Sequence, residues 1–110
     1  MPAFDDFISD VVSGAKDFAR QNLHDFVNQA EGDTRDFLTT SRAELQKWLK
    51  QLSRGEITKE MFENLVQGEK DLATMHTLTE AGVAVATLQR FRDKLIDLVI
   101  DAAFKRFLPI

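Results

Sequence analysis

Apolar or small side chains recur every eleven residues through the first half of the chain. The repeat positions are Phe4, Ala15, Phe26, Phe37 and Trp48. Within each run the first, fifth and ninth residues are mostly apolar or small. Eleven residues over three turns give about 3.67 residues per turn, which keeps such a stripe on one side of a nearly straight helix. The pattern predicts a long amphipathic helix.

The strongest break signal in the sequence lies at residues 53–57. Gly55 suits the left-handed position after a helix C-terminus, and Thr58 can cap the helix that follows. A weaker signal lies at Gly32, but the eleven-residue repeat runs from Phe26 to Phe37 without a change of phase. We expect one continuous helix through Gly32, with a local kink as the alternative.

The second half carries a comparable stripe with helical spacing. Its members are Met61, Leu65, Gly68, Leu72, His76, Thr79, Val83, Ala86, Phe91, Leu95, Leu98 and Ala102. The small and β-branched residues at 81–86 are expected to continue this helix. The fold class is therefore all-α, with residues 1–110 in a single helical-hairpin domain. Helix one spans about 3–52, the turn about 53–57 and helix two about 58–107, each helix being roughly 75 Å long.

The charges of the two predicted helices favour an antiparallel hairpin. Each helix begins with acidic and ends with basic residues, which suits its own macrodipole. Folding back at Gly55 brings acidic starts beside basic ends. The acidic start of helix one holds Asp5, Asp6 and Asp10, and the basic end of helix two holds Arg90, Arg92, Lys94, Lys105 and Arg106. Residues whose numbers sum to about 110 then face each other. Ala15, for example, is expected near Leu95.

One hairpin leaves more apolar surface than its single seam can bury. The residues expected to form an interface beyond the seam are Phe7, Phe18, Leu38, Leu49, Phe62, Val66, Leu88, Val99 and Phe104. Exposed together, they would exceed the few hundred Å² that a monomer normally leaves in one apolar patch. We expect a homodimer in which two hairpins form an elongated four-helix bundle. An unidentified protein partner, or a lipid or hydrophobic-granule surface, is the alternative cover.

The composition excludes several classes of function. A net charge of −4 gives no basic face for nucleic acid. The absence of Cys removes disulfides, zinc–thiolate sites and thiol catalysis. Charged residues interrupt every apolar run before the roughly 20 residues that cross a bilayer. Acidic residues occupy the place where a secretory signal carries bases, so we expect a cytoplasmic location.

The two histidines are the main candidates for chemistry. His76 falls on the predicted inner stripe with Thr34, Ser41 and Thr79, where a polar layer would fix the register of the seam. Metal binding or titration by His76 is the alternative. His24 is expected to be exposed. Because known nucleophile, metal and phosphate-binding motifs are missing, we expect no enzyme, no catalytic residue, no metal and no cofactor.

These patterns predict a non-catalytic structural or adaptor protein. It would act through self-association and protein–protein contacts. The alternative is a peripheral amphipathic protein that coats a lipid or hydrophobic-granule surface. The acidic rather than basic polar face disfavours that alternative.

Overall fold

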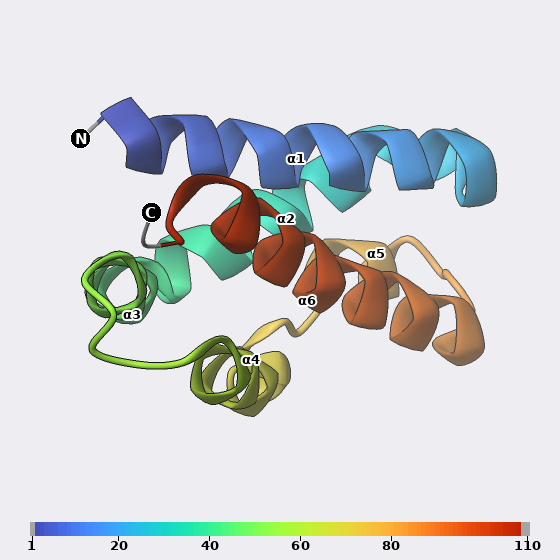
Figure 1. Ribbon diagram of the computed structural model, residues 1–110. Helices are drawn as coiled ribbons and strands as arrows, with labels where there is room; N and C mark the ends of the chain where they lie inside the picture. Colours follow the sequence, from blue (N-terminus) through green and yellow to red (C-terminus); the bar gives the residue numbers. More distant parts are fainter. Residues whose placement is uncertain (1, 109–110) are drawn as a thin grey trace.

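The computed structural model describes residues 2–108, which form helices and turns without a strand. In chain order the elements are α1 (Pro2–Asn22), the 3₁₀ turn η1 (His24–Phe26), α2 (Val27–Thr40), α3 (Arg42–Ser53), α4 (Lys59–Gly68), the 3₁₀ turn η2 (Lys70–Leu72), α5 (His76–Glu80) and α6 (Val85–Arg106), as Figure 1 shows. The predicted all-α class is confirmed.

The two continuous helices predicted for residues 3–52 and 58–107 are wrong. The molecule measures 42 × 24 × 20 Å, far shorter than two helices of roughly 75 Å would be. The helix does continue through Gly32, which lies inside α2, as expected. The breaks in the first half occur instead at Leu23 and Ser41.

The first break reverses the chain between α1 and α2. Leu23 leaves the helical region, with φ −139° and ψ 48°, and its side chain is buried. The Asn22 side-chain amide donates to the carbonyl of Phe18 at 3.0 Å and so serves one of the last carbonyls of α1. After the reversal α2 runs back along α1, where Lys16 pairs with Glu31 at 3.5 Å. The first half of the chain therefore covers part of its own apolar stripe.

The second break is a kink between α2 and α3. Ser41 has φ −94° and ψ 3°, yet its N–H still donates to the carbonyl of Phe37 and its carbonyl accepts from Leu45. The helical bonding continues while the axis changes direction. Arg42 then lies over the ring of Phe4, 5.0 Å from its centroid, which ties the start of α3 to the start of α1.

The predicted turn around Gly55 is confirmed. Gly55 has φ +72°, and the N–H groups of Gly55 and Glu56 donate to the carbonyls of Leu52 and Gln51 at 3.1 and 2.9 Å. This pattern is a Schellman motif, which ends a helix by satisfying its last carbonyls. Thr58 caps α4, since its hydroxyl accepts the backbone N–H three residues later at 3.1 Å. A short α3–α4 hairpin results.

The helix expected through residues 81–86 is wrong, because α5 ends at Glu80 and α6 begins at Val85. Gly82 has φ +88°, a conformation that glycine adopts without strain. The N–H of Val83 donates to the carbonyl of Leu78 at 3.2 Å, giving a second Schellman ending. Gly82 and the β-branched Val83 and Val85 have low helix propensity, and the cap at Gly82 ends the helix although Ala residues stand beside them.

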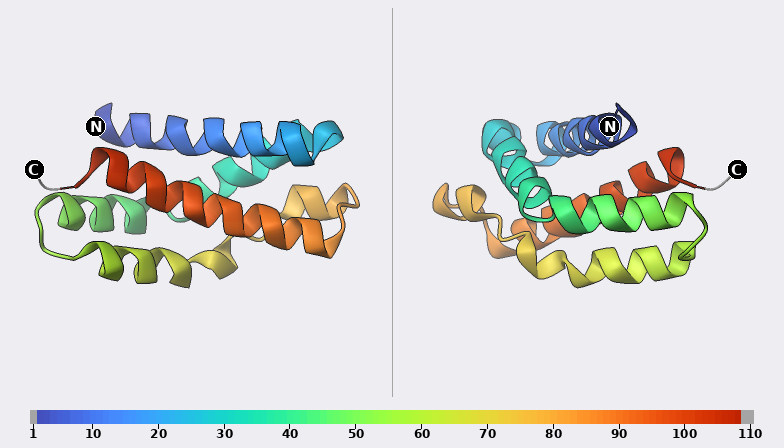
Figure 2. Two further views of the ribbon diagram at one scale, coloured as in Figure 1. Left: turned by 45° about the vertical axis from the view of Figure 1, so that its right-hand side comes forward. Right: turned by 90° about the vertical axis from the view of Figure 1, so that its left-hand side faces the viewer.

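Helices α1 and α6, at the two ends of the chain, run side by side in opposite directions in Figures 1 and 2. The rings of Phe18 and Phe91 have centroids 6.0 Å apart. A Cβ at Gly14 would lie 2.5 Å from Cδ2 of Leu98, so the missing side chain permits this close approach. Both pairs have numbers that sum to about 110, although the long two-helix hairpin from which that sum was expected is not formed.

A buried carboxylate holds α5 against α2. Asp33 is buried, and its two oxygens accept the N–H groups of Thr77 and Leu78 at 2.9 and 2.8 Å. These are free N–H groups in the first turn of α5, which an N-cap side chain normally serves. Met75, the residue at the cap position, has φ +53° and makes no side-chain capping bond. Asp33 therefore caps α5 from another helix.

We expect Asp33→Ala to lower the free energy of unfolding by about 2 to 3 kcal/mol, because two buried N–H groups lose a charged acceptor. Asp33→Asn retains one acceptor oxygen and should lose less. Chemical denaturation measures both values. Hydrogen exchange of the Thr77 and Leu78 amides should accelerate in the Ala variant, and unchanged exchange there would contradict the cap.

The Asp10–Arg106 ion pair is expected to make stability depend on pH. Nε of Arg106 donates to Asp10 at 2.6 Å, and this hydrogen bond holds the pKa of Asp10 below its ordinary value despite partial burial. The contribution is present above the ordinary carboxyl pKa and is lost as pH falls through the lowered value. Asp10→Asn should therefore lower the melting temperature at neutral pH and have little effect at about pH 2.

Arg106→Gln should cause a similar loss at neutral pH. The double variant should lose little more than either single variant, because both single changes break the same pair. Fully additive losses would mean that the two side chains are not coupled.

Candidate interaction surface

Most of the nine residues predicted to form an interface lie inside the single chain. Six are buried: Phe7, Leu38, Leu49, Phe62, Val66 and Val99. The other three, Phe18, Leu88 and Phe104, are partly exposed and pack against the core. The reason for expecting a second hairpin, rows of uncovered apolar side chains, does not apply to the six buried residues. The chain covers them itself because it folds as short helices.

The two apolar rows of α4 have exchanged the roles that the sequence suggests. Phe62 and Val66, assigned to an outer interface, are fully buried where α4 packs against α6 and α3. Met61 and Leu65, assigned to the inner seam, face outward, with Met61 48% exposed and Leu65 half-buried. Spacing alone identifies two rows on one helix but cannot say which row faces the core.

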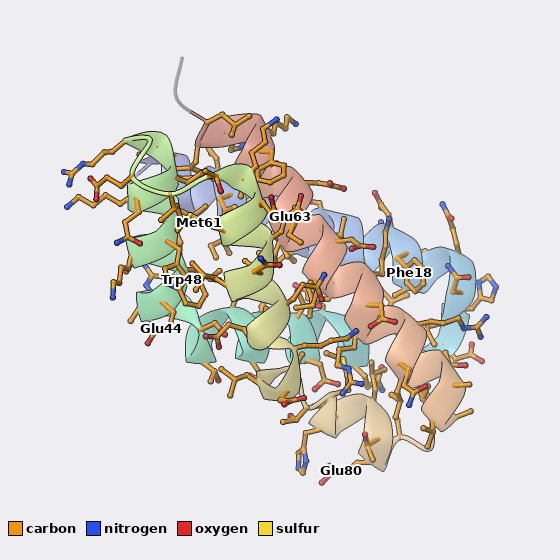
Figure 3. The ribbon with its side chains drawn as sticks, turned by 60° about the horizontal axis from the view of Figure 1, so that its bottom comes forward. Phe18, Glu44, Trp48, Met61, Glu63 and Glu80 are labelled. Atoms are coloured by element: carbon orange, nitrogen blue, oxygen red, sulfur yellow. The ribbon has the colours of Figure 1, made fainter. Side chains whose placement is uncertain are left out.

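Trp48 lies beside this outward row. It is half-buried, packs against the core from α3 and extends toward α4 on the side of the molecule that carries Met61, as Figure 3 shows. We call the surface formed by Trp48, Met61 and Leu65, with the flanking acids Glu44 and Glu69, the α3–α4 face. Its apolar members come from the two arms of one hairpin, so the turn at Gly55 positions them together.

The acids of the α3–α4 face repel each other. Burial raises the pKa of Glu69, and the negative charge of Glu44 raises it further. Neither carboxylate has an ion-pair partner among residues 2–108. Neither acid was predicted from the sequence as part of a site. Their spacing was a usable signal, because Glu44 lies one helical turn before Trp48 and Glu69 one turn after Leu65.

The polar layer predicted around His76 is wrong. The His76 side chain is 74% exposed and pairs with Glu80 at 3.1 Å on the surface of α5. Thr79 is also exposed, whereas Thr34 and Ser41 are fully buried. Thr34 satisfies its hydroxyl within α2, through the carbonyl of Ala30 at 2.8 Å. These four residues therefore do not form one layer. His24 is exposed, as expected.

A second charged surface lies between α4 and α6. This groove of about 370 Å³ is lined by Glu63, Gln67, Lys94, Asp97, Ile100 and Asp101. Across the described part of the chain, no group of three or more His, Cys, Asp or Glu side chains is arranged to hold a metal ion. The charged lining suits solvent better than an apolar ligand.

No helix between residues 2 and 108 combines the length and the apolar character needed to cross a lipid bilayer.

No known protein family, curated protein or solved structure matches this chain.

We expect Glu44→Gln to lower the pKa of Glu69, measured by NMR titration of the side-chain carboxyl, because one of the two causes of its elevation is removed. Glu63→Gln is the matched control, since Glu63 is not a cause of that elevation. An equal fall in both variants would contradict the pairing of Glu44 with Glu69.

Glu69→Gln should raise stability at neutral pH by about 0.5 kcal/mol, the scale of one like-charge contact. A raised pKa means that ionised Glu69 costs stability above that pKa, and the cost disappears as pH falls through it. The gain should therefore vanish at about pH 3. A gain that persists at low pH would have another origin.

Proposed function

We propose that this protein is a non-catalytic structural or adaptor protein that acts through contact with other proteins, and that the α3–α4 face is its contact surface. The observation that carries the proposal is that exposed Met61 and half-buried Trp48 lie on the same outer side of a hairpin whose inner side is buried (Figure 3). Large aromatic side chains and Met are enriched in protein interfaces relative to other surfaces. A half-buried Trp is a rigid anchor that costs little conformational entropy to place.

Protein fits the α3–α4 face better than lipid. An interfacial helix needs a broad apolar side flanked by Lys and Arg. The apolar part of this face has only three members and is flanked by Glu44 and Glu69. Anionic lipid head groups would be repelled by these two charges.

Self-association remains a prediction, and fewer residues are available for it than the sequence suggests. The six interface residues that are buried within one chain are unavailable to a second copy without unfolding. Contact between two copies would have to use the α3–α4 face or the partly exposed Phe18, Leu88 and Phe104. Sedimentation of the full chain over a wide concentration range tests this prediction directly.

The proposal is tested by photo-crosslinking of the full chain in the cells that produce it. p-Benzoylphenylalanine replaces Met61, and Val85, which is 68% exposed at the start of α6, is the matched control position. We expect discrete protein adducts from position 61 and not from position 85. Adding Leu65→Asp should reduce the yield at least about tenfold, since an interface core excludes an unpaired charge.

Adducts of twice the chain mass would identify a second copy as the contact. Lipid adducts without protein adducts, or equal protein adducts from positions 61 and 85, would contradict the proposed function. Circular dichroism of each variant checks that its helix content matches that of the parent.

A further inference from the structure

The α3–α4 face has a polarity that its helices impose. Glu44 precedes Trp48 by one turn on α3, and Glu69 follows Leu65 by one turn at the C-terminus of α4. Because α3 and α4 run in opposite directions from the turn at Gly55, both acids lie at the end of the hairpin away from that turn. The face therefore has an apolar middle and one acidic end.

The acidic end lacks the counterions that some other acids of the molecule have. Glu31 pairs with both Lys16 and Arg35, and Lys70 pairs with Asp93. Between residues 2 and 108, no basic side chain forms an ion pair with Glu44 or Glu69. Partial burial also weakens the solvation of the Glu69 carboxylate. A cation placed between the two carboxylates would offset this lost solvation and reduce the repulsion between the two negative charges.

We propose that the α3–α4 face binds a segment of another protein that presents one Lys or Arg beside aliphatic or aromatic residues. The basic group lies between Glu44 and Glu69, and the apolar residues pack on Trp48, Leu65 and Met61. This proposal rests on the proposed function and names the chemistry of the partner. Lys and Arg suit the place because their methylene stems pack on apolar surface while the charged head reaches a carboxylate.

A second copy of the chain is a poorer occupant than a basic segment. A two-fold axis along the hairpin would bring the acidic ends of the two copies together, where the carboxylates repel each other. A two-fold axis across the hairpin would bring the acidic end of one copy to the turn end of the other. There Gln51 and Thr58 carry no charge, and Arg54 already pairs with Glu56 at 3.8 Å. In both arrangements the face itself supplies no basic residue for the acids that it buries.

The test uses the full chain, immobilised, and a phage-displayed library of short random peptides. We expect enriched peptides to carry Lys or Arg within about four residues of an aliphatic or aromatic residue, the spacing of one helical turn. The synthetic form of the most enriched peptide is then titrated against the variants. Glu44→Gln with Glu69→Gln should weaken binding at least about tenfold, since two charged acceptors are lost. The control pair Glu60→Gln with Glu63→Gln, on exposed positions of α4, should change binding less than about twofold.

A charge reversal gives a positive result that loss of folding cannot imitate. Glu44→Lys with Glu69→Lys should reject the basic peptide and select peptides with Asp or Glu in its place. The same basic preference after reversal would overturn the proposal. Circular dichroism confirms that the reversed variant keeps its helices.

Three further outcomes overturn the proposal, and they separate it from the proposed function. If Leu65→Asp abolishes binding while the Gln pair has no effect, the face is a contact surface and the charge recognition is wrong. If enriched peptides bind Leu65→Asp as tightly as the parent, both the inference and the assigned surface fail. If no peptide is enriched, this recognition is rejected while the crosslinking result stands by itself.

Discussion

The close antiparallel contact of α1 with α6 is the constraint on which the rest of the fold depends. It joins residues near the two ends of the chain, through the Phe18–Phe91 contact and the Asp10–Arg106 ion pair. Gly14 lets the Leu98 side chain reach the backbone of α1, so the two helices approach more closely than larger residues allow. All other helices lie between α1 and α6 in the sequence. The chain between them must therefore leave the end of α1 and come back to the start of α6 within a distance comparable to the length of these two helices. A chain of this size can do so only if its long amphipathic pattern is divided into shorter helices.

The divisions are made by local hydrogen bonds and burial more than by strong helix breakers. Leu23 and Ser41 are ordinary residues whose side chains are buried at the places where the chain changes direction. A buried side chain also positions α5, because the Asp33 carboxylate in α2 supplies the cap that α5 lacks. The segment from η2 to α5 buries Ala73, Met75 and Leu78 in the core. Its position therefore depends on these three side chains and on Asp33.

Sequence patterns predicted the features that depend on local chemistry or on charge. Residues close together in the sequence predict the helical class, the turn at Gly55 and the cap at Thr58. The sign of the charges near each chain end predicts the pairing of acidic with basic ends. The breaks at Leu23 and Ser41 could not be predicted, because neither position carries Gly or Pro. An eleven-residue stripe suits one straight helix, but it suits equally a series of short helices that bury the stripe against each other. The sequence likewise could not predict which side of α4 faces the core, because the helix carries two apolar rows and either could be buried.

The α3–α4 face is a consequence of that competition. Phe62 occupies the inner position of α4, where the centroid of its ring lies 6.0 Å from the centroid of the Phe104 ring. Turning α4 to bury Met61 instead would expose this larger aromatic ring and lose more buried area. Met61 and Leu65 are therefore left outside by the best packing of the single chain. A solitary exposed apolar residue needs no explanation. A Met, a Leu and a Trp beside two acids without counterions are a different case, because a partner that binds there, as we propose, can be selected by charge as well as by apolar area.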